Sequence, residues 1–230
     1  MRSAMLVAAL AVAAVLATAT TPANAAPREP WTAGYTLGIS RSSFDRTLGD
    51  SIPEGQFGFG FGVFATVPVI PRVTFMPEIL LTTKGGTFKE PLYLTAFSID
   101  STISDTTYYA GDVRRTMDLT YVELPMIVQL ALGRPGASFN PHVQLGVAPS
   151  FRLLGRFRSG NFTGTEPADP DDAKRIDFGW IAAAGFNLRT RRAAMRLDLR
   201  FTQGIVNAFD AGDGPAGRNQ AWTLVFGITP

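Results

Sequence analysis

Cysteine is absent from this 230-residue chain, and histidine occurs once, as His142. Without cysteine the chain can form no disulfide, carry no lipid on an N-terminal cysteine, and offer no thiolate to a metal or a substrate. A single histidine leaves little for nucleophilic catalysis, in which histidine is the usual general base. The dense acidic stretch at residues 169–172 lacks the glycine spacing of a calcium-binding loop. We therefore predict no catalytic residue, no metal site and no cofactor, and a structural role for His142.

Long apolar runs are also missing. A membrane-spanning helix needs roughly 20 consecutive apolar residues, whereas the apolar run at residues 6–16 is shorter and follows the single cation Arg2. Ala23 and Ala25 then form a small-x-small cleavage site. The sequence therefore predicts a secretory signal peptide over residues 1–25 and one mature domain over residues 26–230, with no transmembrane helix.

Period-two alternation of apolar and polar residues is abundant. From Ala194 to Phe201 every second residue is apolar and charged residues lie between them, which is typical of a strand with one apolar face. The pattern recurs about eight times along the chain. The predicted strands are residues 31–40, 56–69, 73–83, 117–132, 141–154, 177–189, 193–205 and 220–229.

The strand lengths and connections favour a membrane barrel. Most of these runs are longer than the 5 or 6 residues usual in globular strands, and they suit a tilted span of roughly 9 to 11 residues. Long and short connections alternate, as they do between the two rims of an outer-membrane barrel. We predict an all-β, eight-stranded antiparallel up-and-down transmembrane β-barrel, with apolar faces toward lipid and both mature termini in the periplasm. The alternative is a soluble lipocalin-like barrel that binds an apolar ligand, with its apolar faces inside.

Charge is nearly balanced but unevenly distributed. The chain has 21 Lys and Arg against 19 Asp and Glu, and no basic stripe indicates nucleic-acid binding. Thirteen of the 19 acidic residues fall in the four long connections. The short turns hold only cations: Arg72, Arg134, Arg191 and Arg192. Ordinary solvated loops explain the acidic residues, and contact with divalent cations or surface sugars is the sharper alternative.

The polar faces place six ionisable residues inside the predicted barrel. Because an unpaired charge in a narrow lumen costs several kcal/mol, we expect these residues to pair, with Glu78 and Glu123 joined to Arg196 or Arg200. This network is either a polar plug or part of a gated ion path. The full set of predicted lumen charges is Glu78, Glu123, Arg152, Arg196, Asp198 and Arg200.

Four segments resemble the PorT-like outer-membrane β-barrel family. Residues 76–85 (MPEILLTTKG) and 121–128 (YVELPMIV) are similar to its third and fourth strands, and residues 141–151 and 177–185 to later ones. The resemblance covers the mature chain in order. It implies an eight-stranded barrel in the outer membrane of a Gram-negative bacterium but little about activity. A founding member of the family is associated with protein secretion and sorting to the surface, and we expect a role linked to envelope integrity or protein secretion. It carries over no catalytic residue. The C-terminal end departs from the aromatic ending common in barrels, because Phe226 is followed by four more residues.

Three functions are consistent with these observations. The first is a structural or interaction protein, a monomer that enters the membrane through the barrel-assembly machinery, sits in outer-membrane lipid and meets a surface or secretion partner through its long loops. The second is a narrow pore for ions or small solutes. The third is the soluble binder of an apolar ligand.

Overall fold

The computed structural model describes residues 31–45, 54–96, 106–134, 136–159, 174–206 and 217–230. The predicted signal peptide and the acidic residues 169–172 lie outside this part of the chain. Within it, no helix is long and apolar enough to cross a membrane. The described strands are β1 (Thr32–Phe44), β2 (Glu54–Ile70), β3 (Val73–Ala96), β4 (Thr106–Glu123), β5 (Met126–Ala131), β6 (Phe139–Ser159), β7 (Ile176–Arg189), β8 (Ala194–Gly204) and β9 (Asn219–Thr229).

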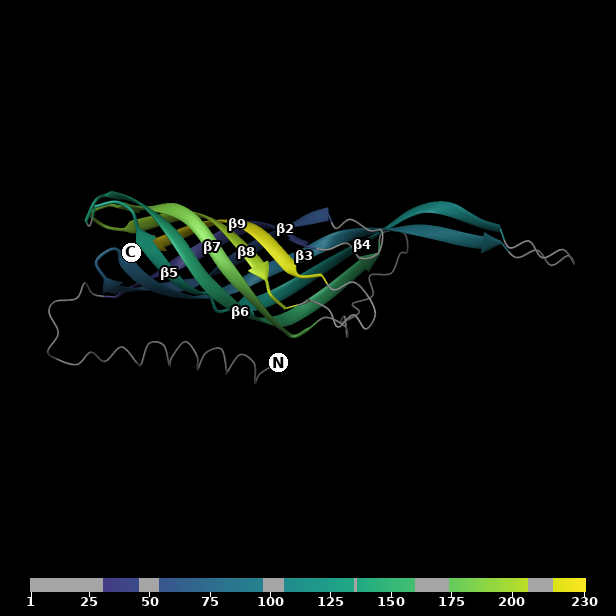
Figure 1. Cartoon of the computed structure of the whole chain (residues 1–230), viewed down its shortest axis with the longest axis horizontal. Coiled ribbons are helices and arrows are strands. Elements are labelled where there is room, and N and C mark those ends of the chain that lie inside the picture. Colours follow the sequence, from purple (N-terminus) through teal and green to yellow (C-terminus); the bar gives the residue numbers. More distant parts are fainter. Residues whose placement is uncertain (1–30, 46–53, 97–105, 135, 160–173, 207–216) are drawn as a thin grey trace, which may run out of the picture. The chain divides into compact units, whose positions relative to one another are not determined.

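All the pairings are antiparallel and they close into a ring (Figure 1). Apart from β4 and β5, consecutive strands pair with each other, and the last strand pairs with the first, for example Leu37 with Phe226. Strands β4 and β5 occupy one place in the ring, because both lie between β3 and β6. The prediction of an eight-stranded antiparallel up-and-down barrel is therefore confirmed.

The fourth predicted strand is interrupted at Leu124 and Pro125. Proline has no backbone N–H for the ladder, so regular pairing stops there. The neighbouring strands remain attached, because Glu78 N–H donates to the Pro125 carbonyl at 2.8 Å and Leu124 N–H donates to the Pro149 carbonyl at 2.9 Å. The break is thus a local irregularity within one strand position of the barrel.

The apolar faces point outward. On β2, Phe57, Phe59 and Phe61 are 72%, 66% and 57% exposed. The lipocalin-like alternative requires these side chains inside, and it is therefore wrong. A closed barrel can bury them only against lipid, since its own interior is on the other face of the sheet.

Small residues inside the barrel make room for large ones. A Cβ atom built on Gly34 would lie 2.2 Å from the Ile228 carbonyl oxygen and 2.7 Å from the ring of Phe64. The Phe64 ring points into the lumen and is 5% exposed. Gly34 therefore permits both close strand approach and the aromatic core residue beside it.

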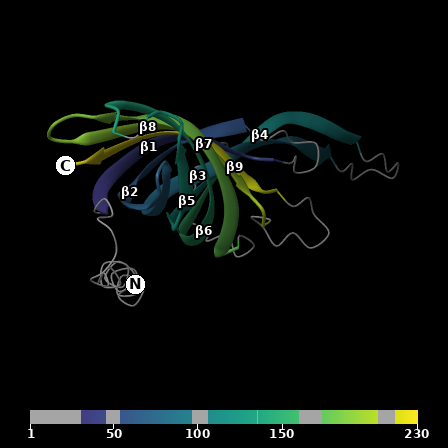
Figure 2. The same ribbon diagram turned by 60° about the vertical axis from the view of Figure 1, so that its left-hand side comes forward.

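The predicted long connection over residues 84–116 is wrong. β3 continues to Ala96 and β4 begins at Thr106, and the two pair from Leu80 with Glu123 to Ala96 with Thr106 (Figure 2). β2 pairs with β3 only as far as Thr87, and β6 pairs with β4 only from Arg115 onward. Beyond these positions β3 and β4 form a two-stranded ribbon. β6 likewise runs on to Ser159, past its predicted end.

Candidate functional site

The lumen holds all six predicted charged residues, and each is nearly inaccessible to solvent. They come from β3, β4, β6 and β8, whose inward positions converge on the barrel axis. Their exposed fractions are Glu78 2%, Glu123 5%, Arg152 7%, Arg196 4%, Asp198 0% and Arg200 3%.

Glu78 is the centre of the polar cluster nearer the short turns. Arg200 binds it with two nitrogens, Nη1 to Oε2 at 2.8 Å and Nη2 to Oε1 at 3.1 Å. Arg196 Nη2 donates to Oε1 at 2.8 Å. One carboxylate thus accepts three charge-assisted hydrogen bonds, two of them from a bidentate guanidinium, which is the strong form of such pairs.

Asp198 balances the second arginine. Its Oδ2 lies 3.0 Å from Arg196 Nε, and its Oδ1 lies 2.7 Å from His142 Nε2. Gln144 Nε2 donates to Asp198 Oδ2 at 3.2 Å. Two carboxylates and two guanidinium groups therefore face one another with no net charge. We call this set (Glu78, Arg196, Asp198, Arg200, His142 and Gln144) the Glu78 cluster.

Apolar side chains enclose the Glu78 cluster. The guanidinium of Arg196 stacks 4.5 Å from the centre of the Phe64 ring and contacts the sulfur of Met76. Phe64 and Met76 belong to the buried apolar core with Ile127, Ala148 and Ile181. Such surroundings lower the local dielectric and strengthen the ion pairs, but they also make an unpaired charge very costly.

A second polar cluster lies farther toward the ribbon. Glu123 forms an ion pair with Lys84, whose ammonium lies 5.9 Å from the centre of the Tyr121 ring. Asn219 Nδ2 donates to Asp177 Oδ2 at 2.7 Å and to the Tyr121 hydroxyl at 3.4 Å. We call these residues (Lys84, Tyr121, Glu123, Asp177 and Asn219) the Glu123 cluster. Arg152 is buried at the register position opposite Tyr121.

The space between these side chains is small. One cavity, bordered by Lys84, Glu123 and Arg200, has a volume of about 40 Å³. Another, beside Asp177 and Asn219, offers about 10 Å³. Ligand pockets usually measure roughly 300 to 1,000 Å³, so these cavities suit a few waters and no organic ligand.

The structure brings together only part of what the sequence suggested. Glu78 meets both Arg196 and Arg200, whereas Glu123 forms an ion pair with Lys84, which is not among the six predicted residues. The predicted third strand, residues 73–83, ends one residue before Lys84 and so leaves it outside the sheet. Lys84 shares the even numbering of Glu78, so a longer third strand would have placed it in the lumen.

His142 lies in the lumen and not in an open cleft. Its Nε2 is within hydrogen-bond distance of Asp198 and Gln144, at 2.7 and 3.0 Å. Its Nδ1 is buried without a hydrogen-bond partner. Among the described residues, no group of three or more His, Asp or Glu side chains could hold a metal ion. The cluster can therefore hold charge and fix side chains. Among the described residues, the hydrogen-bond partners of His142 are Asp198 and Gln144, and neither carries a hydroxyl group.

A family model described as "outer membrane protein beta-barrel domain" matches residues 22–210. No curated protein sequence matches the chain.

Similar solved structures include three small outer-membrane proteins. Ail, the attachment invasion locus protein of Yersinia pestis, in complex with the heparin analogue sucrose octasulfate, is 11% identical, with 86% of this chain and 97% of Ail covered and a TM-score of 0.38. Neisserial surface protein A is 8% identical, with 88% and 100% covered and a TM-score of 0.42. The outer membrane enzyme PagL is 12% identical, with 84% and 99% covered and a TM-score of 0.31.

Proposed function

The chain belongs to the outer membrane protein beta-barrel domain family, and we propose that it acts at the cell surface as a non-enzymatic interaction protein whose lumen is a plug. It is an outer-membrane β-barrel protein, as the sequence predicted. The proposal concerns what the barrel does there.

The observation that carries the proposal is the filled lumen. The Glu78 cluster occupies the interior with ion pairs of 2.8 to 3.1 Å, and the cavity beside it offers only about 40 Å³. Moving an ion through this region would require breaking pairs whose charges are then left buried, at a cost of several kcal/mol. A partner or ligand is therefore met outside the lumen.

The ribbon of β3 and β4 is the outside element that we assign to this contact. Its backbone pairing continues from Phe88 with Arg115 to Ala96 with Thr106. At about 3.3 Å per residue, this carries it roughly 30 Å past the last β2–β3 pair. A two-stranded ribbon alone is marginally stable in water, and its outer backbone edges can pair with an added strand.

The absence of an enzymatic function is part of the proposal. Barrel-embedded hydrolases need a nucleophile beside a base, whereas His142 is bound to Asp198 and Gln144 deep in the lumen. The sequence offers no second histidine.

The finer assignments follow the sequence motifs. We propose a signal peptide over residues 1–25, insertion by the barrel-assembly machinery, a monomer with both mature termini in the periplasm, and a PorT-like role linked to secretion or envelope integrity. In this orientation the ribbon faces the outside of the cell.

The test compares full-length protein with a ribbon-less variant in a host that lacks the gene. Replacing residues 89–114 by Asn-Gly joins the register partners Phe88 and Arg115 through a two-residue hairpin turn. The β2–β3 pairs up to Thr87 and the β4–β6 pairs from Arg115 onward remain. We expect the full-length gene to restore envelope integrity and surface secretion, and the ribbon-less gene to insert but not restore them.

Planar-bilayer recordings test the plug separately. The purified barrel should be electrically silent, because the Glu78 cluster closes it. Steady conductance by the unmodified protein would contradict the closed lumen and support the narrow pore. If the ribbon-less gene fully restores envelope integrity and surface secretion, the ribbon is not needed for the function.

A further inference from the structure

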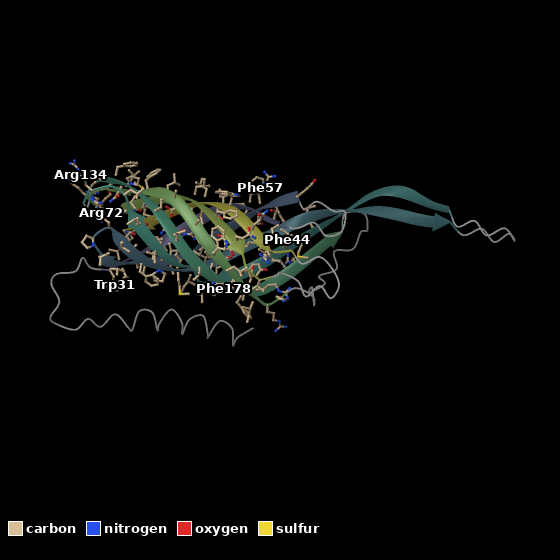
Figure 3. All side chains as sticks on the ribbon, in the orientation of Figure 1. Trp31, Phe44, Phe57, Arg72, Arg134 and Phe178 are labelled. Carbon is tan, nitrogen blue, oxygen red and sulfur yellow. The ribbon has the colours of Figure 1, made fainter. Side chains whose placement is uncertain are left out.

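The short-turn rim of the barrel carries cations without acids. Its three turns contain Arg72, Arg134, Arg191 and Arg192, and all four side chains are exposed. Arg72 and Arg134 are labelled at the same end of the barrel in Figure 3, away from the ribbon. The turns contain no Asp or Glu. This rim is therefore a ring of like charge, and within the part of the chain that the structure describes none of these four arginines forms an ion pair.

Exposed apolar residues adjoin these arginines. Ile70 and Leu132, two positions from Arg72 and Arg134, are 61% and 56% exposed. Leu188, three positions before Arg191, is 38% exposed. Two or three residues span roughly 7 to 10 Å along a strand, which is about the depth of a headgroup layer beside the hydrocarbon core. The guanidinium groups can therefore reach the phosphates of the adjacent leaflet.

Arg72 occupies a backbone position that favours glycine. It follows Pro71 in the two-residue turn between β2 and β3, and its φ is +76°. Proline followed by a residue with positive φ is typical of a type II turn, where Gly or Asn is usual. A side chain there carries a conformational cost, and such strained positions cluster at sites that hold ligands. Glycine would therefore satisfy this turn at a lower conformational cost than arginine.

We infer that Arg72, Arg134, Arg191 and Arg192 form a binding surface for the phosphate groups of anionic phospholipids in the leaflet beside the short turns. This inference rests on the proposed placement of the barrel in the membrane. Guanidinium groups match phosphate oxygens in a bidentate geometry, and basic residues next to a bilayer are attracted to anionic headgroups. Charge complementarity favours this occupant, because zwitterionic headgroups would leave the ring of like charge uncompensated.

Trp31 provides a local reporter. It lies at the same end of the barrel as Arg72 and Arg134 in Figure 3 and is 45% exposed. Trp180 and Trp222 lie near the first residues of β7 and β9, at the end of the barrel away from the short turns. Full-length mature protein with Trp180→Phe and Trp222→Phe would be folded into phosphatidylcholine vesicles that contain increasing fractions of brominated phosphatidylglycerol. Quenching of Trp31 by this lipid, relative to brominated phosphatidylcholine, gives the relative affinity of the rim for the two headgroups.

We expect a preference of roughly fivefold or more for phosphatidylglycerol, which falls as salt is added. The variant R72Q/R134Q/R191Q/R192Q should reduce it to near onefold. The matched control R41Q/R156Q/R175Q removes exposed arginines from the other end and should leave the preference unchanged. Two results would overturn the inference: equal affinity of the unmodified protein for the two lipids, or a preference for phosphatidylglycerol that persists in the variant with all four substitutions. Either result would leave an acidic protein as the alternative occupant of this surface.

Arg72→Gly separates binding from folding. Glycine accepts the positive φ without strain, so this variant should fold at least as well as the parent on a heat-modifiability gel while its lipid preference declines. An unchanged preference would remove Arg72 from the surface. Failure of the membrane placement itself is distinguishable, since Trp31 would then be quenched by neither brominated lipid.

Discussion

The two polar clusters of the lumen differ in how completely their charges are compensated. Glu78 is bound by two arginines through three hydrogen bonds, and its side chain has no exposed surface. Glu123 has an ion pair with one flexible lysine, and its side chain is 6% exposed beside the cavity of about 40 Å³. Because desolvation and pairing both scale with burial, the half of the lumen near the short turns is the rigid part of the plug. The half near the ribbon has room to adjust.

Replacing Glu78 with glutamine should have the largest effect. The amide keeps the shape but takes from Arg200 the carboxylate that its guanidinium binds with two nitrogens, and Asp198 remains to Arg196 as an ion-pair partner. Removing one partner of a buried ion pair costs about 3 to 5 kcal/mol. Urea unfolding of the barrel in vesicles, followed by tryptophan fluorescence, should show this loss. If Glu123→Gln lowers the free energy of unfolding as much as Glu78→Gln does, the two clusters do not differ in the way described.

A smaller loss is expected when Phe64 is changed to leucine. The ring stacks on Arg196 at 4.5 Å and fills the space left by Gly34, so the variant loses a cation–π contact and opens a cavity. We expect a loss of about 1 to 3 kcal/mol in the same unfolding experiment. Leu80→Val, which trims the wall of the cavity near Glu123, is the matched control and should cost less.

The pair of Lys84 and Glu123 should be replaceable as a unit. Apolar residues of similar size in place of both partners remove the charges and their desolvation cost together, and such replacements are often neutral or stabilising. We expect Lys84→Met with Glu123→Leu to change the free energy of unfolding by less than about 1 kcal/mol, and either substitution alone to cost more. A double variant as unstable as the sum of the single variants would show that the second cluster is as rigid as the first.

The same contrast explains which features the sequence could predict. Alternation is a local property, so the inward placement of Arg196, Asp198 and Arg200 followed directly from their spacing. The choice of partner across the lumen depends on the tilt and stagger of the closed sheet, which no single strand encodes. The ion pair of Glu123 with Lys84 is therefore a contact that the sequence pattern alone does not predict.

Strand ends were harder to predict where the alternation fades. Gly85 and Gly86 come two and three residues after Thr83, and Pro91 lies a few residues later. Glycine and proline are both typical of loops. The pairing of Gly85 with Asp118 and of Pro91 with Asp112 keeps them in the ladder. Proline is tolerated at a strand edge, and the ribbon consists of two such edges beyond the last β2 and β6 pairs.

Excision of the ribbon should have the smallest effect on stability. The Asn-Gly replacement of residues 89–114 removes only pairs between β3 and β4 that lie beyond Thr87 and Arg115. Since a free two-stranded ribbon is marginally stable in water, its loss should change the free energy of unfolding by less than about 1 kcal/mol, measured with urea beside Glu78→Gln. A larger loss would mean that the ribbon packs on the barrel and supports it. If the ribbon-less barrel is as stable as the full-length protein, the ribbon does not support the fold, and contact with another molecule is the reason for its presence.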